Sequence, residues 1–156
     1  MKHILIAGIP EGGKTHIGSY LEKEKGFLHK DIEVMIKSGQ LKSESDFDHL
    51  INELTNNKKD IVVTWGFDPY HDVDLVQKFK DAGFRLFWFD ADIQKAKEFY
   101  DNNPNKGYKR HFEGQVKNIL DSGIIDKLNF IKIKTLHEDG SRINESELAE
   151  FIINQS

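Results

Sequence analysis

Residues 8–15 read Gly-Ile-Pro-Glu-Gly-Gly-Lys-Thr, a complete match to the pattern G-x-x-x-x-G-K-[ST]. An apolar run at residues 4–7 comes directly before this stretch, and the spacing of Ile17, Tyr20 and Leu21 after it is typical of a helix. A strand, a glycine-rich turn and a helix in this order aim backbone N–H groups and a helix dipole at one point, which attracts phosphate. The alternative, a flexible turn that only caps a helix, requires an eight-residue coincidence. The sequence therefore predicts a phosphate-binding loop.

The residues of this loop have expected roles in binding a nucleoside triphosphate. Lys14 is expected to reach the β- and γ-phosphates, and the Thr15 hydroxyl is expected to ligate Mg²⁺. ATP and Mg²⁺ are therefore the expected cofactors. The candidate nucleotide-binding residues follow one another along the chain: Gly8, Ile9, Pro10, Glu11, Gly12, Gly13, Lys14, Thr15 and His16.

Composition limits the class of protein. A chain of 156 residues, with 38% hydrophobic and 31% charged residues, predicts one soluble domain over residues 1–156. The formal net charge of −4 gives no general field for nucleic acid, so no nucleic-acid partner is expected. The absence of cysteine excludes disulfides and suits a cytoplasmic location. No apolar run reaches membrane-spanning length, so no membrane partner is expected, and the oligomeric state stays open.

Strand-like and helix-like segments alternate along the whole chain. Alternation of this kind predicts an α/β fold, with a doubly wound parallel sheet and helices on both faces. The last strand, Phe130-Ile-Lys-Ile-Lys134, alternates apolar and charged residues, so it is expected at a sheet edge. The five expected strands cover residues 4–7, 26–29, 60–65, 84–89 and 130–134.

Several helix limits can also be predicted. A helix over residues 43–56 carries apolar residues at i, i+3, i+4 and i+7. Gly83 is placed to end the next helix, and the pair Asn144 and Glu147 forms a capping-box-like start of the last one. A helix late in the chain is expected to pack with Phe112, Val116, Ile119 and Leu120.

Four segments together resemble the small P-loop kinases, a family that includes shikimate kinase and adenylate kinase. They are the loop with Pro10 in third place, the strand-end segment Phe27-Leu-His-Lys-Asp31, the pair Gly66-Phe67 and the stretch 102–110. The resemblance implies a five-stranded sheet of order 2-3-1-4-5 and a short lid at about residues 102–113. It also implies transfer of the γ-phosphoryl group of ATP to a small-molecule or nucleotide acceptor, with the adenine near residues 137–140.

The acceptor side of such a site needs a carboxylate to hold an incoming hydroxyl. Asp31 is the first choice as a catalytic and substrate-binding residue, because ligands bind at strand ends in such sheets. The alternative is that Asp31 is the N-cap of a helix over residues 32–37. Gly66, Phe67 and Asp68 are expected at the acceptor, although Asp68 precedes a proline and also suits a turn. Glu33 is a weaker candidate, expected as a solvated helix residue.

The lid candidate carries three cations among turn-forming residues. Arg110 is the expected catalytic contact of the transferring phosphate, because a guanidinium can hold two oxygens at once. Lys106 and Lys109 are the expected helpers at the substrate. The alternative is a solvated basic loop.

Departures from the family pattern leave two other functions open. Glu11 stands where relatives have a small residue, Thr64 and Trp65 end the third strand without a Walker-B acid, and residues 92–100 contain no arginine. One alternative is therefore a degenerate kinase relative that binds or hydrolyses nucleotide in a regulatory role. The other is an interaction domain that uses nucleotide as a structural ligand.

Overall fold

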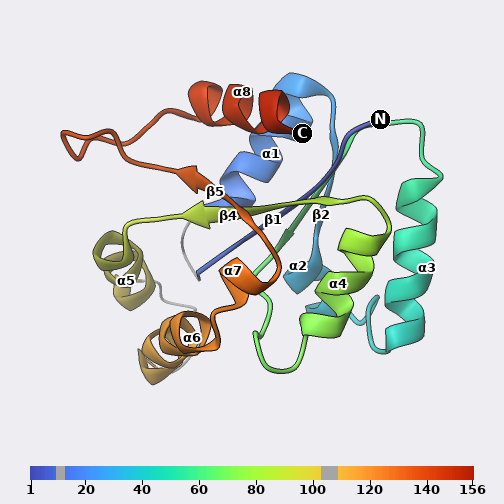
Figure 1. Cartoon of the computed structure of the whole chain (residues 1–156), viewed down its shortest axis with the longest axis horizontal. Helices are drawn as coiled ribbons and strands as arrows, with labels where there is room; N and C mark the ends of the chain where they lie inside the picture. Colours follow the sequence, from blue (N-terminus) through green and yellow to red (C-terminus); the bar gives the residue numbers. More distant parts are fainter. Residues whose placement is uncertain (10–12, 103–108) are drawn as a thin grey trace.

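The chain folds around a five-stranded parallel sheet (Figure 1). The computed structural model describes residues 1–9, 13–102 and 109–156; for Phe99 and residues 109–111 it describes the backbone only. The strands pair in the order β2-β3-β1-β4-β5, and every pairing is parallel. This confirms the fold class and the implied strand order. The strands are β1 (His3–Gly8), β2 (Leu28–Asp31), β3 (Ile61–Trp65), β4 (Arg85–Asp90) and β5 (Ile131–Lys134).

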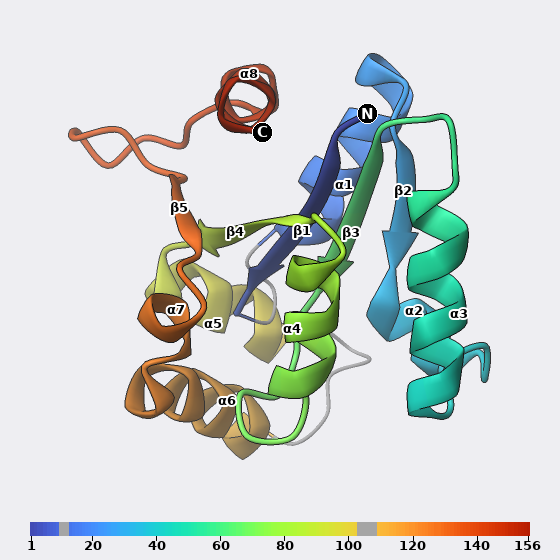
Figure 2. The same ribbon diagram turned by 45° about the vertical axis from the view of Figure 1, so that its right-hand side comes forward.

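Helices cover both faces of the sheet, as Figures 1 and 2 show. One face packs against α1 and α8, and the other packs against α2 to α7, so that each face has its own apolar core. No helix in the described part of the chain is long and apolar enough to cross a membrane. The helices are α1 (Lys14–Lys25), α2 (Ile32–Lys37), α3 (Glu44–Thr55), α4 (Val73–Asp81), α5 (Ile93–Asn102), α6 (Lys109–Ser122), α7 (Ile124–Lys127) and α8 (Glu145–Gln155).

Local signals set the helix ends where the sequence predicts them. Ser43 caps α3 with a full capping box, and Gly83, with a φ of +98°, follows the end of α4. The Asn144 side chain accepts a hydrogen bond of 2.9 Å from the Glu147 N–H at the start of α8. Strand β5 lies at the edge of the sheet, as its alternating pattern predicts.

Two expectations are wrong in detail. The second strand was expected at residues 26–29 but begins at Leu28, because Gly26 takes a left-handed conformation and its N–H donates to Leu21 O, which closes α1. Leu120 was expected in the core but is 62% exposed, since Phe112, Val116 and Ile119 already form the buried stripe of α6. The helix expected over residues 32–37 is α2.

Candidate functional site

The phosphate loop connects the central strand to the helix that covers it. It follows β1, and α1 begins at Lys14 directly after Gly13, whose φ of +94° is in the left-handed region that favours glycine. Pro10, Glu11 and Gly12 lie outside the described residues. The motif requires a strand before the loop and a helix after it, and both are present.

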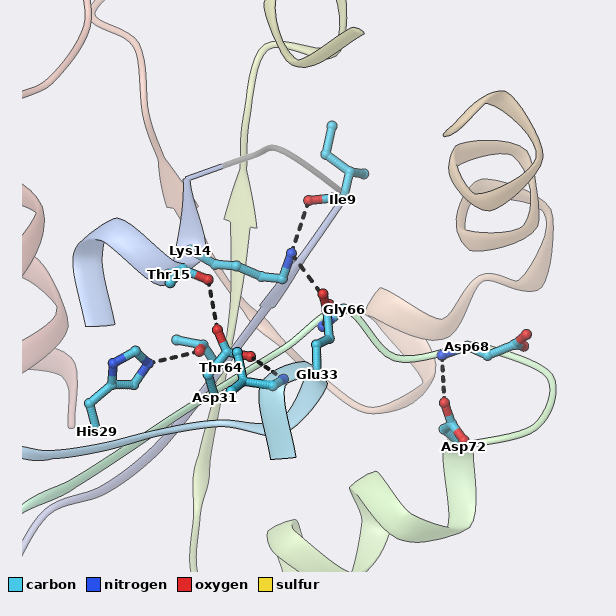
Figure 3. Close-up of polar contacts among 11 residues, drawn as sticks. Ile9, Lys14, Thr15, His29, Asp31, Glu33, Thr64, Gly66, Asp68 and Asp72 are labelled. Carbon is cyan, nitrogen blue, oxygen red and sulfur yellow. Dashed lines mark hydrogen bonds and ion pairs between the residues drawn. The ribbon is translucent and has the colours of Figure 1, made fainter. Parts of the chain in front are cut away.

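Lys14 is a buried cation at the first position of α1, with only 7% of its surface exposed. Its ammonium group donates a hydrogen bond of 3.3 Å to the backbone oxygen of Ile9 and lies 3.9 Å from Glu33 Oε1 (Figure 3). The positive charge is thus held between the loop backbone and a carboxylate from α2. It is the kind of fixed charge that a triphosphate requires.

Thr15 and Asp31 form a second polar pair beside the loop. The Thr15 hydroxyl donates a 3.1 Å hydrogen bond to Asp31 Oδ2 (Figure 3). The other carboxylate oxygen of Asp31 accepts from the Val34 N–H at 3.3 Å, so Asp31 is also the N-cap of α2, as the alternative interpretation predicts. A hydroxyl and a carboxylate oxygen are hard ligands that suit Mg²⁺, which takes one or two protein carboxylates and completes its shell with phosphate and water.

Glu33, expected as a solvated helix residue, lies in the first turn of α2 with 46% of its side chain exposed, and it also faces the site. Its Oε1 accepts a hydrogen bond of 2.8 Å from the Gly66 N–H, and it faces Lys14 across the end of β3. A Cβ at Gly66 would collide with Glu33 Oε1 and lie 3.2 Å from the Lys14 ammonium. Glycine at this position therefore lets a carboxylate, a lysine and the backbone meet. The available signal was the spacing from Asp31: the first turn of a helix that starts at the strand end also projects toward the site.

The His29 side chain packs against α1, the helix that follows the phosphate loop. Its Nε2 is hydrogen-bonded to Thr64 Oγ1 at 2.8 Å, and its ring packs against Gly18 of α1 so closely that a Cβ there would lie 2.5 Å from Nε2. Burial lowers the pKa of His29 below its ordinary value, against the opposing charges of Asp31 and Glu22. The side chain of Thr64, at the end of β3, is therefore buried and bonded to His29.

Two cavities lie beside the phosphate loop. The larger, of about 690 Å³, is bounded by the start of α1, the end of β4 and the segment that leads into α8. Gly13 and His16, two of the expected nucleotide-binding residues, line it. The same cavity is lined by residues of the segment after β5, from Arg142 to Ser146, rather than by residues 137–140. A Cβ at Gly13 would lie 4.0 Å from an Arg142 guanidinium nitrogen, so this cation, which the sequence did not single out, lies close to the described end of the loop.

The smaller cavity, of about 260 Å³, lies at the end of β1, where the loop begins. Gly8 lines it from the end of β1, and Glu33 lines it from α2. This cavity is also lined by Gly66, Phe67 and Asp68, the three residues after the third strand that were expected at the acceptor. Asp31 is not among its lining residues, because its carboxylate is turned to Thr15 and the α2 backbone.

Asp68 holds the turn between β3 and α4. Its Oδ1 accepts hydrogen bonds from the N–H groups of Tyr70 at 2.8 Å and His71 at 3.2 Å. Its own N–H donates to Asp72 Oδ2 at 2.8 Å (Figure 3). Partial burial acts to raise the pKa of Asp68, but the hydrogen bonds from Tyr70 and His71 outweigh it and lower the pKa below its ordinary value. Asp68 is therefore a turn residue whose charge borders the smaller cavity.

The lid candidate falls largely outside what the structure describes. Helix α5 ends at Asn102 and α6 begins at Lys109. Lys106 lies outside the described residues, and so do the side chains of Lys109 and Arg110. The expected roles of these three cations stay predictions.

Comparison with known proteins identifies the fold. No family model and no curated protein matches the chain. Among solved structures, the chain is similar to shikimate kinase from Acinetobacter baumannii in complex with shikimate, with a TM-score of 0.65, 17% identity and coverage of 99% of this chain and 93% of that one. It is also similar to a tunicamycin resistance protein from Deinococcus radiodurans (TM-score 0.65, 18% identity, 99% and 94% covered). A third similar structure is a gluconokinase from Sinorhizobium meliloti 1021 (TM-score 0.60, 12% identity, 99% and 97% covered). The chain therefore has the fold of the small P-loop kinases.

Proposed function

We propose that this protein is an ATP-dependent phosphotransferase that moves the γ-phosphoryl group to a small acceptor. One observation carries the proposal: each described end of the phosphate loop lines a cavity, Gly13 the larger and Gly8 the smaller. The Lys14 ammonium lies between the loop backbone and Glu33 of the smaller cavity. A donor and an acceptor bound on opposite sides of one cation are positioned for transfer between them.

The larger cavity is the proposed site of the nucleotide. In that position the triphosphate passes over Gly13 to the start of α1, where backbone N–H groups and the Lys14 ammonium neutralise its charge. Thr15 and Asp31 would hold Mg²⁺ through their side-chain oxygens, and the ion would offset part of the negative charge of the phosphates. Phosphoryl transfer depends mainly on such positioning and neutralisation.

On the acceptor side we assign the catalytic carboxylate to Glu33 rather than to Asp31. Glu33 lines the smaller cavity and faces Lys14, whereas both oxygens of Asp31 are engaged by Thr15 and Val34. In the transfer step the acceptor oxygen forms a bond to the γ-phosphorus while the bond from that phosphorus to the β–γ bridging oxygen breaks. ADP leaves, and the hydroxyl proton passes to the Glu33 carboxylate.

A protein that binds nucleotide without transferring phosphate is the second candidate. It is favoured by Thr64 at the end of β3, which is buried and bonded to His29 at the point where many P-loop proteins hold an acid. The arginine-free sequence of α5 also favours it. Arg110, with Lys106 and Lys109, remains our proposed source of the missing phosphate contacts.

Nucleotide binding is tested by comparing two lysine variants. Lys14→Ala removes the buried cation, and Lys23→Ala removes an exposed lysine of the same helix, so both change the net charge equally. Calorimetric titration with a non-hydrolysable ATP analogue and Mg²⁺ should show a large loss of affinity in the first variant and none in the second. Equal affinity in both would remove the basis for a nucleotide site.

Transfer is tested separately through the two carboxylates. ADP release and phosphorylated product are measured with a broad panel of acceptors and an acceptor-free control. Glu33→Gln, which keeps a hydrogen-bond acceptor for the Gly66 N–H, should lower the transfer rate by about 10²–10⁴-fold and leave ATP binding nearly unchanged. Asp31→Asn keeps the helix cap and should instead raise the Mg²⁺ concentration needed. Nucleotide binding without transfer to any acceptor would favour the second candidate.

A further inference from the structure

The charges around the smaller cavity are unbalanced. Three carboxylates line it, from Glu33, Asp68 and Asp72, against one ammonium group, from Lys37. The nearby Lys14 ammonium is bonded to Ile9 O and lies 3.9 Å from Glu33 Oε1, so it offsets one of the three negative charges. The described lining residues thus give this cavity an excess of negative charge.

Hydrogen bonds hold two of these carboxylates, those of Asp68 and Asp72, in place. Asp68 and Asp72 are bonded within one turn, through the Asp68 N–H and the N–H groups of Tyr70 and His71. These bonds favour the charged form of Asp68, whose pKa is lowered. A ligand that carried its own carboxylate or phosphate would therefore meet fixed charges of the same sign.

The other lining residues suit a ligand that has hydroxyl groups and an apolar carbon skeleton. Gln115 and Asn118 of α6 present amide groups, each of which can both donate and accept a hydrogen bond. Ile36, Phe67 and Ile119 add apolar surface. The volume of about 260 Å³ lies below the ~300–1,000 Å³ of common ligand pockets, so the cavity suits a molecule smaller than a nucleotide.

We infer that the acceptor is a small polyhydroxylated compound that carries no phosphate or carboxylate group, such as a sugar, a sugar alcohol or an amino sugar. This inference rests on the proposed function. It narrows the acceptor classes left open by the sequence and excludes nucleotide acceptors. One hydroxyl is held by Glu33 next to Lys14, and the amides of Gln115 and Asn118 bind the others.

The test uses ligand pairs that differ in charge on a shared skeleton: glucose with glucuronate, and ribose with ribose 5-phosphate. Binding to the full chain is measured by calorimetry in the presence of a non-hydrolysable ATP analogue and Mg²⁺. In at least one pair the uncharged member should bind about tenfold more tightly or better, and glucosamine should bind at least as tightly as glucose. Equal or tighter binding of the anionic members, or no binding of any uncharged member, would overturn the inference.

A pair of variants tests whether the cavity charge is the cause. Asn118→Lys adds one positive charge inside the cavity, and Asp121→Asn makes the same change in net charge on the exposed side of α6. The preference for the uncharged ligand should fall by about tenfold in the first variant and stay unchanged in the second. The same shift in both variants, or in neither, would show that the cavity does not set it.

These measurements distinguish a failure of this inference from a failure of the proposed function. Binding of uncharged ligands without phosphoryl transfer would retain this inference and refute the transferase proposal. Transfer to anionic acceptors only would retain the transferase proposal and refute this inference.

Discussion

Gly66→Ala is the substitution from which we expect the sharpest functional effect. The φ of Gly66 is not positive, so alanine meets no backbone strain there. Its Cβ would collide with Glu33 Oε1 and approach the Lys14 ammonium to 3.2 Å. Gly66 and Glu33 both line the smaller cavity, and at least the Glu33 carboxylate must move to make room for the Cβ.

The structure sets the size of the effect. Loss of the bond from the Gly66 N–H to a carboxylate costs about 1.5–3 kcal/mol for a charged acceptor. Because the Glu33 side chain is 46% exposed, we expect about 1 kcal/mol of lost stability. A displacement of about 1 Å at reacting groups can reduce turnover about 10²-fold, so the transfer rate should fall by that order. Nucleotide affinity should change less than the transfer rate, because Gly66 does not line the larger cavity.

Gly114→Ala is the matched control. A Cβ at Gly114 meets no atom within 4 Å, and the residue lies inside α6, so alanine should raise the free energy of unfolding by about 0.5–1 kcal/mol without changing transfer. Steady-state kinetics and thermal melts of both variants provide the comparison. In a Glu33→Ala background, Gly66→Ala should cost much less further activity, because the collision with the carboxylate is gone. Normal turnover in the single variant would refute the proposed contact of the three groups.

Three further predictions concern the support of the site. Gly18→Ala should destabilise the fold in spite of the better helix propensity of alanine, since its Cβ would lie 2.5 Å from His29 Nε2, and chemical denaturation should show the loss reversed by His29→Ala. Because the pKa of His29 is lowered in the folded chain, this imidazole is protonated at a higher pH in the unfolded chain than in the folded one. The free energy of unfolding should therefore fall as the pH drops below about 6.5, by at most about 1.4 kcal/mol per pH unit. His29→Gln should flatten this slope relative to His49→Gln, a substitution at an exposed histidine of α3. Asn144→Ala should cost about 1 kcal/mol in denaturant titrations by removing the bond to the Glu147 N–H, whereas Asn144→Ser should retain most of the stability.

The phosphate loop and the fold were predictable because their signals are local. The strand–turn–helix context of Gly13 and Lys14 is contained in about twenty residues of sequence. The order of the strands followed from a family resemblance rather than from any residue pattern. Asp31 as the cap of α2 was also predictable, because a cap bond joins residues three positions apart.

The partners across the site were not predictable, because they depend on contacts between distant segments. Glu33 meets Gly66 across 33 positions of sequence, and nothing in either neighbourhood specifies the other. Arg142 comes close to Gly13 only because β5 pairs with β4 and brings the next segment back over α1. The sequence shows which residue types are present, whereas strand pairing decides which of them meet.

The strand order also explains why the two cavities flank the phosphate loop. Strand β1 is paired with β3 on one side and β4 on the other, so the chain leaves the ends of these strands in opposite directions. Such a switch point leaves a crevice outside the carboxyl ends of the strands, where ligands of α/β proteins bind. On the β3 side, the turn at Gly66 and helix α2 enclose the smaller cavity. On the β4 side, Phe89 and the segment from Arg142 enclose the larger one. Because the loop follows the strand at the switch point, its lysine lies beside Glu33 of the smaller cavity. In the function that we propose, a phosphoryl group held by Lys14 would therefore face an acceptor bound in that cavity.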